Sequence, residues 1–187
     1  MTDLEIIQCV LHNDRADFRL LVEKYQSMVF RTCMGFLHHK EDAEDLTQEI
    51  FVQVYQSLAS FKAEASFPTW LYRISVNASL NHLRKSSKWG FLQRMENRFE
   101  ADLSIPENEN PENLLIQDEH RKWVKAALDS LPEKQRTAIV LSKYDDLSQK
   151  EISEVMQTTE GAVEALLQRA KANLRAKLQP KHKKNKK

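Results

Sequence analysis

Apolar residues recur at steps of three and four over most of the chain, which is the spacing of amphipathic helices. Two such stripes open the sequence, one over residues 4–11 and a longer one over residues 18–37. We predict a helix for each stripe, the second ending between Gly35 and His39. The longer stripe is best explained as core and contains Phe18, Leu21, Val22, Tyr25, Val29 and Cys33.

A third helix is predicted from about Asp42, because acidic residues fill its first turn, where the helix dipole favours negative charge. Its apolar side repeats at helical spacing and is expected to be buried, whereas Asp45, Gln48, Glu49 and Gln53 fall largely elsewhere and stay exposed. The predicted buried face consists of Ala43, Leu46, Ile50, Val54 and Leu58.

A fourth helix is predicted after an aromatic loop at residues 61–67. Ser66 marks its approximate start, with Pro68 in the first turn, where the missing N–H of proline costs nothing. Trp70, Leu71, Ile74 and Ala78 supply its apolar side. Its polar residues Asn77, Asn81 and Arg84 follow at steps of four and three, so they share one face.

Periodicity fades between Ser86 and Asn113, where the acidic, proline-containing run IPENENPEN predicts a flexible linker and a domain boundary. Helical patterns resume near Leu114 and continue to Leu178, interrupted at Pro132, at Asp145 and at a tight turn over residues 157–159. The predicted division is a first domain at 1–86, a linker at 87–113, a second domain at 114–178 and a basic tail at 179–187.

Composition supports an all-α protein made of two small helical domains. The chain has 187 residues but three glycines and five prolines, too few for the many tight turns of a sandwich or barrel. Two cysteines make no disulfide framework, which favours a reducing cytosol. The sequence contains no basic signal region and no apolar run near 18 residues, so we expect a cytoplasmic protein without direct membrane insertion.

The formal net charge is only +1, but the charges are segregated. No acidic residue follows Glu164, and the end of the chain is lysine-rich. Residues 148–178 read as a helix-turn-helix, in which Ser148 and Glu151 form a capping box and the second helix enters the major groove. A helical hairpin with a solvated charged face is the plain alternative. The outward residues of the second helix are Glu160, Ala162, Glu164, Ala165, Gln168, Arg169, Lys171 and Arg175.

A second nucleic-acid signal lies in the first domain. The amides Asn77 and Asn81 and the base Arg84 suit base edges and phosphates, and nearby aromatic residues such as Phe61 and Trp70 suit unstacked bases. The alternative is that the aromatic residues are core and the asparagines merely exposed. Neither an activated nucleophile nor a phosphate-binding glycine loop is recognisable, so we expect no enzyme activity and no cofactor.

A metal site is not expected either. Cys33 lies near His38 and His39 in sequence, but a structural zinc site needs four ligands and no further cysteine or histidine lies nearby.

Three segments together resemble the extracytoplasmic-function (ECF) group of bacterial sigma factors. They are DAEDLTQEIFVQVYQSLASF, TWLYRISVNASLNHLRK and SLPEKQRTAIVLSKYDDLSQKEISEVMQTTEGAVEALLQRAKANL. The resemblance covers nearly the whole chain in the same order. It implies two helical domains, sigma region 2 and sigma region 4, in a promoter-specificity subunit of RNA polymerase.

The resemblance also implies roles for individual residues. The acidic third helix would bind the β′ coiled coil of core polymerase, through Asp45, Gln48, Glu49 and Phe51. The loop would form a pocket for a flipped base of the −10 element, and the fourth helix would read or melt that element. The implied −10 residues are Lys62, Ala63, Glu64, Ser66 and Phe67 of the loop, with Asn77, Asn81 and Arg84.

The last helix would read the −35 element, and the family often begins it with GTV-(K/R)-SR. This chain has Gly161-Ala162-Val163-Glu164-Ala165-Leu166 there, so its promoter sequence cannot be carried over. Implied partners are core polymerase, through the β′ coiled coil and the β flap, promoter DNA, and an anti-sigma factor that could hold the chain at the inner face of the membrane.

Competing functions remain open from the residues alone. A helix-turn-helix repressor or activator would bind duplex DNA, usually as a dimer on a palindrome, without polymerase. A helical adaptor would show no salt-dependent DNA affinity. An RNA-binding role fits the basic tail but is not favoured by the helix-turn-helix.

Overall fold

A computed structural model describes residues 1–12, 17–96 and 123–178, with side chains for all of these except 87–96. Every regular element in these ranges is a helix, as the sequence predicts. The elements are α1 Asp3–Leu11, α2 Phe18–Leu37, α3 Lys40–Ser57, the 3-10 turn η2 Leu58–Ser60, α4 Phe67–Glu96, α6 Glu133–Lys143, α7 Gln149–Met156 and α8 Glu160–Leu178. Residues 123–129 are also helical.

Side-chain caps fix where several of these helices begin. Thr2 and Glu5 form a capping box at α1, and Ser148 and Glu151 form the predicted one at α7. At α4 the Ser66 hydroxyl accepts from the Thr69 N–H at 3.2 Å, which supports the start expected from the sequence.

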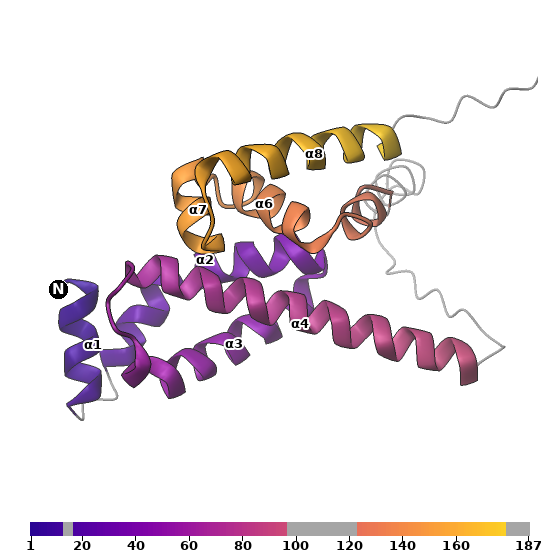
Figure 1. Ribbon diagram of the computed structural model, residues 1–187. Helices are drawn as coiled ribbons and strands as arrows, with labels where there is room; N and C mark the ends of the chain where they lie inside the picture. The colour runs from indigo at the N-terminus through magenta and orange to yellow at the C-terminus, as the bar shows by residue number, and fades with distance from the viewer. Residues whose placement is uncertain (13–16, 97–122, 179–187) are drawn as a thin grey trace, which may run out of the picture.

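The helices α2 and α4 form the middle of the molecule (Figure 1). On one side they pack against α1 and α3, and on the other against α6 and α7. The helix α8 lies outermost, packed on α6 and α7. We call α1–α4 the first unit and residues 123–178 the second unit.

One apolar core runs through both units. The first unit contributes the fully buried Leu21, Val29 and Phe36 of α2, and the second contributes Leu141 and Ile152. All five predicted core residues of α3 and η2 are buried: Ala43, Leu46, Ile50, Val54 and Leu58.

The helix α4 extends further than its sequence pattern indicates. The predicted domain end is residue 86, but α4 continues to Glu96 and so covers the first ten residues of the predicted linker. Residues 87–96 contain no proline, and their glycine, Gly90, costs a helix only about 1 kcal/mol relative to alanine, so the helix can continue through this stretch. The remaining linker residues, the predicted start near Leu114 and the basic tail lie outside the described residues.

Among the described residues, no helix combines the length and the apolar character that a membrane crossing requires.

Candidate nucleic-acid and protein interfaces

The exposed face of α3 carries the predicted polymerase-binding residues. Asp45, Gln48 and Glu49 line a shallow, open hollow of about 490 Å³ together with the next turns of the helix. Val52 lies in the same face with 58% of its surface exposed, so this polar surface has an apolar centre. An exposed aliphatic side chain ringed by amides and acids suits a protein partner.

Phe51 does not share this face. Only 6% of its surface is exposed, and its ring packs edge-on against Phe18 with the centroids 6.4 Å apart. The step from Glu49 to Phe51 turns the side chain by about 200° around the helix, which points it into the core. Phe51 therefore packs α3 against the core, and it offers little surface to a partner.

The predicted loop borders a second hollow, of about 500 Å³. Ala63, Glu64, Ser66 and Phe67 line it, whereas the exposed Lys62 lies outside the lining. Phe67 is 3% exposed and packs against the rings of Tyr25, Phe61 and Trp70, at centroid distances of 5.4, 5.7 and 5.8 Å. The aromatic residues thus belong largely to the core, and their packing fixes the position of the loop.

The start of α1 forms part of the same hollow, which the sequence did not reveal. Thr2, Asp3 and Leu4 line it. Asp3 accepts from Lys24 Nζ and from the Tyr25 hydroxyl, both at 2.6 Å. Burial, and then this hydrogen bond, raise the pKa of Tyr25 to about 12, so the hydroxyl remains a donor to Asp3. In the sequence Asp3 resembles any first-turn acid, and no local signal shows its long-range partners.

On α4, Asn77, Asn81 and Arg84 are exposed on one face, as the spacing predicts. Arg84 Nη1 donates to Asn81 Oδ1 at 3.0 Å, so two of the three act as a pair. Arg84 also donates through Nε and Nη2 to both carboxylate oxygens of Glu133, at 2.8 and 2.6 Å. This bidentate pair raises the pKa of Arg84 and lowers that of Glu133.

The helices α7 and α8 form the predicted helix-turn-helix. Gln157 turns the chain in the left-handed region, with φ 51°, and the Thr159 hydroxyl accepts from the Ala162 N–H at 3.2 Å to start α8. Buried Val163, Leu167 and Ala170 fix α8 against the second unit. On its outer side Glu160, Glu164, Gln168, Arg169, Lys171 and Arg175 are exposed, whereas Ala162 and Ala165 are half-buried.

Gln168 Nε2 donates to Glu164 Oε1 at 3.2 Å, one turn apart. Glu164 therefore has a local partner in the absence of DNA, and the basic residues are gathered in the second half of α8, from Arg169 onward.

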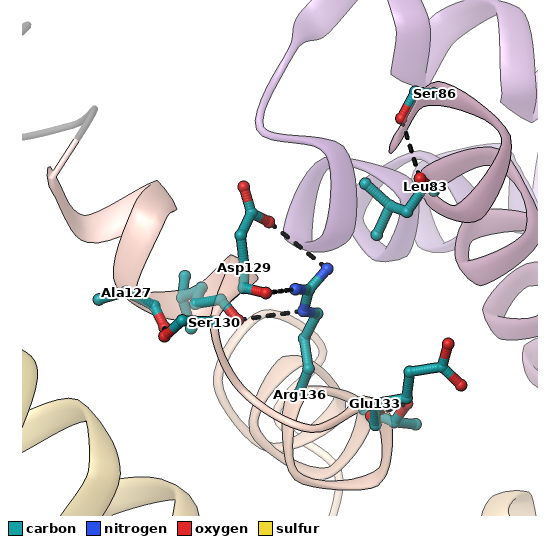
Figure 2. A network of polar contacts seen from close by, with 9 residues as sticks. Leu83, Ser86, Ala127, Asp129, Ser130, Glu133 and Arg136 are labelled. Atoms are coloured by element: carbon teal, nitrogen blue, oxygen red, sulfur yellow. Dashed lines mark hydrogen bonds and ion pairs between the residues drawn. The ribbon is translucent and has the colours of Figure 1, made fainter. Parts of the chain in front are cut away.

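The end of the helix at residues 123–129 is closed by Arg136 of α6 (Figure 2). Its guanidinium donates to the carbonyls of Leu128 and Asp129 and lies 3.4 Å from the Asp129 carboxylate. A cation at the negative end of a helix satisfies carbonyls that have no partner within it. Figure 2 shows the Glu133 carboxylate turned away from Arg136, which leaves it available to Arg84.

Comparisons with known proteins identify the family of this chain. Residues 21–89 match the family model of sigma-70 region 2, and residues 121–174 match that of sigma-70 region 4. The chain is 36% identical to the ECF RNA polymerase sigma-E factor of Escherichia coli (strain K12) over 96% of each chain. This chain belongs to the ECF group of sigma factors. As a sigma factor it binds core RNA polymerase and directs transcription initiation at promoters.

The sigma factor has further relatives of similar length. It is 34% identical to the RNA polymerase sigma-H factor of Pseudomonas aeruginosa, over 95% of this chain and 94% of that one. Among solved structures, CnrH in complex with the cytosolic domain of CnrY matches with a TM-score of 0.65 at 22% identity, over 93% and 95% of the two chains. RpoE of Bartonella quintana in complex with the anti-sigma factor NepR matches with a TM-score of 0.59 at 20% identity, over 88% and 98%. These structures share the fold.

Proposed function

We propose that this sigma factor binds core polymerase and the two promoter elements through three separate surfaces. The exposed face of α3 binds core polymerase, the loop and α4 bind the −10 element, and α8 binds the −35 element. In this division residues 1–86 are the region 2 domain, 87–113 the linker, 114–178 the region 4 domain and 179–187 a basic tail that adds nonspecific attraction to DNA.

The polymerase surface is proposed to consist of Asp45, Gln48 and Glu49 with Val52 at its centre. All three polar residues line one hollow, and Val52, at 58% exposed, is the most exposed large apolar residue of the described helices. Phe51 then acts through the packing of α3 rather than by contact. The partner on this surface is proposed to be the β′ coiled coil, with the β flap contacting the region 4 domain.

The −10 site is proposed to combine the loop hollow with the polar face of α4. A hollow of about 500 Å³ is large enough for a nucleobase, and the backbone groups and short side chains of its loop can contact the edge of a base. Asn77 and Asn81 would hold the separated strand, because amides both donate to and accept from unpaired bases. Glu64 and Ser66 line the hollow, and Lys62 stands beside it as a phosphate contact.

At the −35 element the start of α8 would enter the major groove. Glu160 and Glu164 can accept from the N4 amino group of cytosine, and Gln168 can pair with adenine. Arg169, Lys171 and Arg175 supply the salt-dependent phosphate contacts. The half-buried Ala162 and Ala165 leave room for a close approach of the backbone or of a thymine methyl group.

The single observation that carries this proposal is the exposure of Asn77 and Asn81 on a helix whose opposite side is core. Exposed asparagines inside a helix are unfavourable for helix stability, so a binding role accounts for their presence. The chain is proposed to have no catalytic activity of its own, since the reaction belongs to polymerase.

Control by an anti-sigma factor is also proposed. Its support is the structural likeness to RpoE, whose solved structure contains the anti-sigma factor NepR. We propose a cytoplasmic location, because the promoters that a sigma factor recognises lie on the chromosome. A membrane-bound anti-sigma factor could hold the chain at the inner face of the membrane.

The test is in vitro transcription with core polymerase over a promoter library, comparing wild type with Asn77→Ala and Asn81→Ala. We expect both variants to bind core polymerase as wild type does in gel filtration but to form open complexes at least about fivefold less well. Each lost amide contact to an unpaired base costs about 1 kcal/mol or more.

Wild-type initiation by both variants would remove the −10 assignment. Specific duplex binding by the wild type without any association with polymerase would instead favour a simple helix-turn-helix regulator.

A further inference from the structure

The hollow beside the loop is formed by two distant parts of the chain. Residues 61 and 63–67 line one side, and Thr2, Asp3 and Leu4 at the start of α1 line the other. The helix α1 packs on α2 and η2, so it stands at the end of the molecule where the loop lies (Figure 1). The loop is therefore not a binding surface by itself, because a group that enters the hollow also meets the first turn of α1.

Asp3 is held at this hollow by two hydrogen bonds from α2. Its Oδ1 accepts from Nζ of Lys24 and its Oδ2 from the Tyr25 hydroxyl, both at 2.6 Å, and its side chain is 20% exposed. Tyr25 also packs against Phe67, with the ring centroids 5.4 Å apart, and Phe67 lines the loop side of the hollow. One tyrosine thus connects Asp3 to the loop and fixes the position of the carboxylate.

The attachment of α1 has support besides Asp3. Ile6, Ile7 and Val10 are buried and anchor the helix in the core. Its first turn is closed by the capping box of Thr2 and Glu5. The helix can therefore fold and pack without this carboxylate, and the place of Asp3 at the rim of a hollow needs a further reason.

The carboxylate of Asp3 still has acceptor capacity. An ionised carboxylate has about four lone-pair sites and no donor, and Lys24 and Tyr25 occupy two of those sites. Glu64, exposed on the loop side, is the second charged residue of the lining and is likewise an acceptor only. Both sides of the hollow therefore offer carboxylate oxygens to a group that can donate.

Nucleobases differ in what they can donate to such a site. Cytosine, adenine and guanine each carry an exocyclic amino group, at N4, N6 and N2 respectively. Thymine has none, and its carbonyl oxygens would face the carboxylates as acceptor against acceptor. A polar group that loses water without gaining a partner is penalised, so thymine should be the base that this hollow disfavours.

We propose that the first turn of α1 is part of the −10 site, and that Asp3 together with Glu64 selects a flipped base with an exocyclic amino group and rejects thymine. Asp3 is then a specificity-determining residue, and Tyr25 is the residue that positions it. This inference rests on the proposed function, because it takes the loop hollow as the site of the flipped base.

The test is in vitro transcription by holoenzyme, formed from core polymerase and the full chain, over templates randomised through the −10 element. At one −10 position wild type should use thymine at least about fivefold less than the best base. Asp3→Asn keeps the size of the side chain but places an amide donor where only acceptors stood. It should raise the use of thymine at that position at least about threefold and leave the preferences at other positions unchanged.

Glu23→Gln is the matched control. Glu23 is an exposed acid of α2 that pairs with Arg19 and does not line the hollow, so its neutralisation should leave every −10 preference as in wild type. If Asp3→Asn loses helical content by circular dichroism, Glu64→Gln on the exposed loop replaces it and should weaken the same preference at the same position.

Tyr25→Phe separates positioning from charge. It removes one bond to Asp3 but keeps the ring that packs on Phe67 and the carboxylate itself. Initiation by this variant should fall about equally on all templates, while thymine remains the disfavoured base.

Three results would count against these assignments. A −10 preference that Asp3→Asn leaves unchanged, with its helices intact, would overturn the role of Asp3 and leave the loop site standing. Thymine tolerated at every −10 position would overturn the selection for an amino group. A wild type with no base preference anywhere in the −10 element would refute the proposed function itself.

Discussion

At the scale of single residues, Asp145 is the most informative side chain. It lies in a turn, where an aspartate is normally exposed, yet its hydrogen-bond and ion-pair partners come from α2 of the other unit. Burial raises its pKa to about 6, although Thr32 and Arg31 act in the opposite direction. The free energy of unfolding should therefore depend on pH.

The direction of that dependence follows from the two states. An exposed aspartate has a pKa of about 3.9, so Asp145 binds a proton more readily in the folded chain than in the unfolded chain. Its protonation favours folding, and this contribution is lost as pH rises through about 6. His38 opposes it, because burial lowers the pKa of His38 and its protonation disfavours the folded state. The groups that face Asp145 are Arg31, Thr32 and Cys33 of α2, Tyr72 of α4 and the adjacent Asp146.

Comparing wild type with Asp145→Asn isolates the aspartate. Between pH 7.5 and pH 5 the free energy of unfolding of wild type should rise by about 1.4 kcal/mol relative to that of the asparagine variant. Denaturant titrations at the two pH values measure this difference. Asp146→Asn makes the same change at an exposed neighbour whose φ of 53° asparagine tolerates, and it should respond to pH as wild type does. An equal pH response in Asp145→Asn would contradict the assignment.

At the scale of elements, α3 shows how one helix can pack in the core on one side and present a binding surface on the other. Its apolar side is core, and its exposed side is the proposed polymerase surface. Charge reversal on the exposed side should then act on binding without unfolding the helix.

We expect Glu49→Lys to weaken binding to core polymerase at least tenfold, because a like-charge contact replaces an attractive one. Glu44→Lys is the matched control, since Glu44 is exposed on the same helix but does not line the hollow. Fluorescence titration of labelled polymerase measures both. Equal weakening by the two variants would indicate a general charge effect rather than the proposed surface.

Helix boundaries and faces were predictable from the sequence where a local signal exists. The Ser148–Glu151 capping box, the start of α4 at Ser66 and the shared face of Asn77, Asn81 and Arg84 all follow from spacing within one or two turns. The end of α4 has no such signal, because the apolar period fades after Ser86 although the helix continues to Glu96. A helix can extend beyond its packed face when no residue stops it.

The parts of the site that the sequence missed depend on residues far apart in the chain. Asp3 bonds to Tyr25, Arg84 to Glu133 and Asp145 to Thr32, and no periodicity links these pairs. Phe51 is buried although the family motif names it beside exposed residues, because a step of two residues along α3 turns its side chain toward the core. The functional roles of the site residues stay predictions.

At the scale of the whole molecule, a continuous core joins the two units. Units that share a core should unfold together, since separating them exposes apolar surface on both. We expect a single calorimetric transition for wild type, with equal calorimetric and van't Hoff enthalpies.

A Cβ atom at Gly35 would stand 2.7 Å from Cγ1 of Val140 in the second unit, whereas a Cβ atom at Gly161 would meet nothing within 4 Å. Gly35→Ala should therefore divide this transition into two or make its van't Hoff enthalpy clearly smaller than its calorimetric enthalpy, and Gly161→Ala should leave it single. Differential scanning calorimetry at neutral pH makes the measurement. Two transitions already present in wild type would mean that the units are independent in solution.

The hollow at the start of α1 has a practical consequence. Thr2, Asp3 and Leu4 line it, so Met1 stands directly beside the surface proposed to receive a flipped base. A purification tag fused ahead of Met1 would place foreign peptide at this rim and could fill the hollow or unsettle the Asp3 bonds. Promoter preferences measured on such a fusion would describe the tag as well as the protein, so cleaving it off belongs in the design of any specificity experiment.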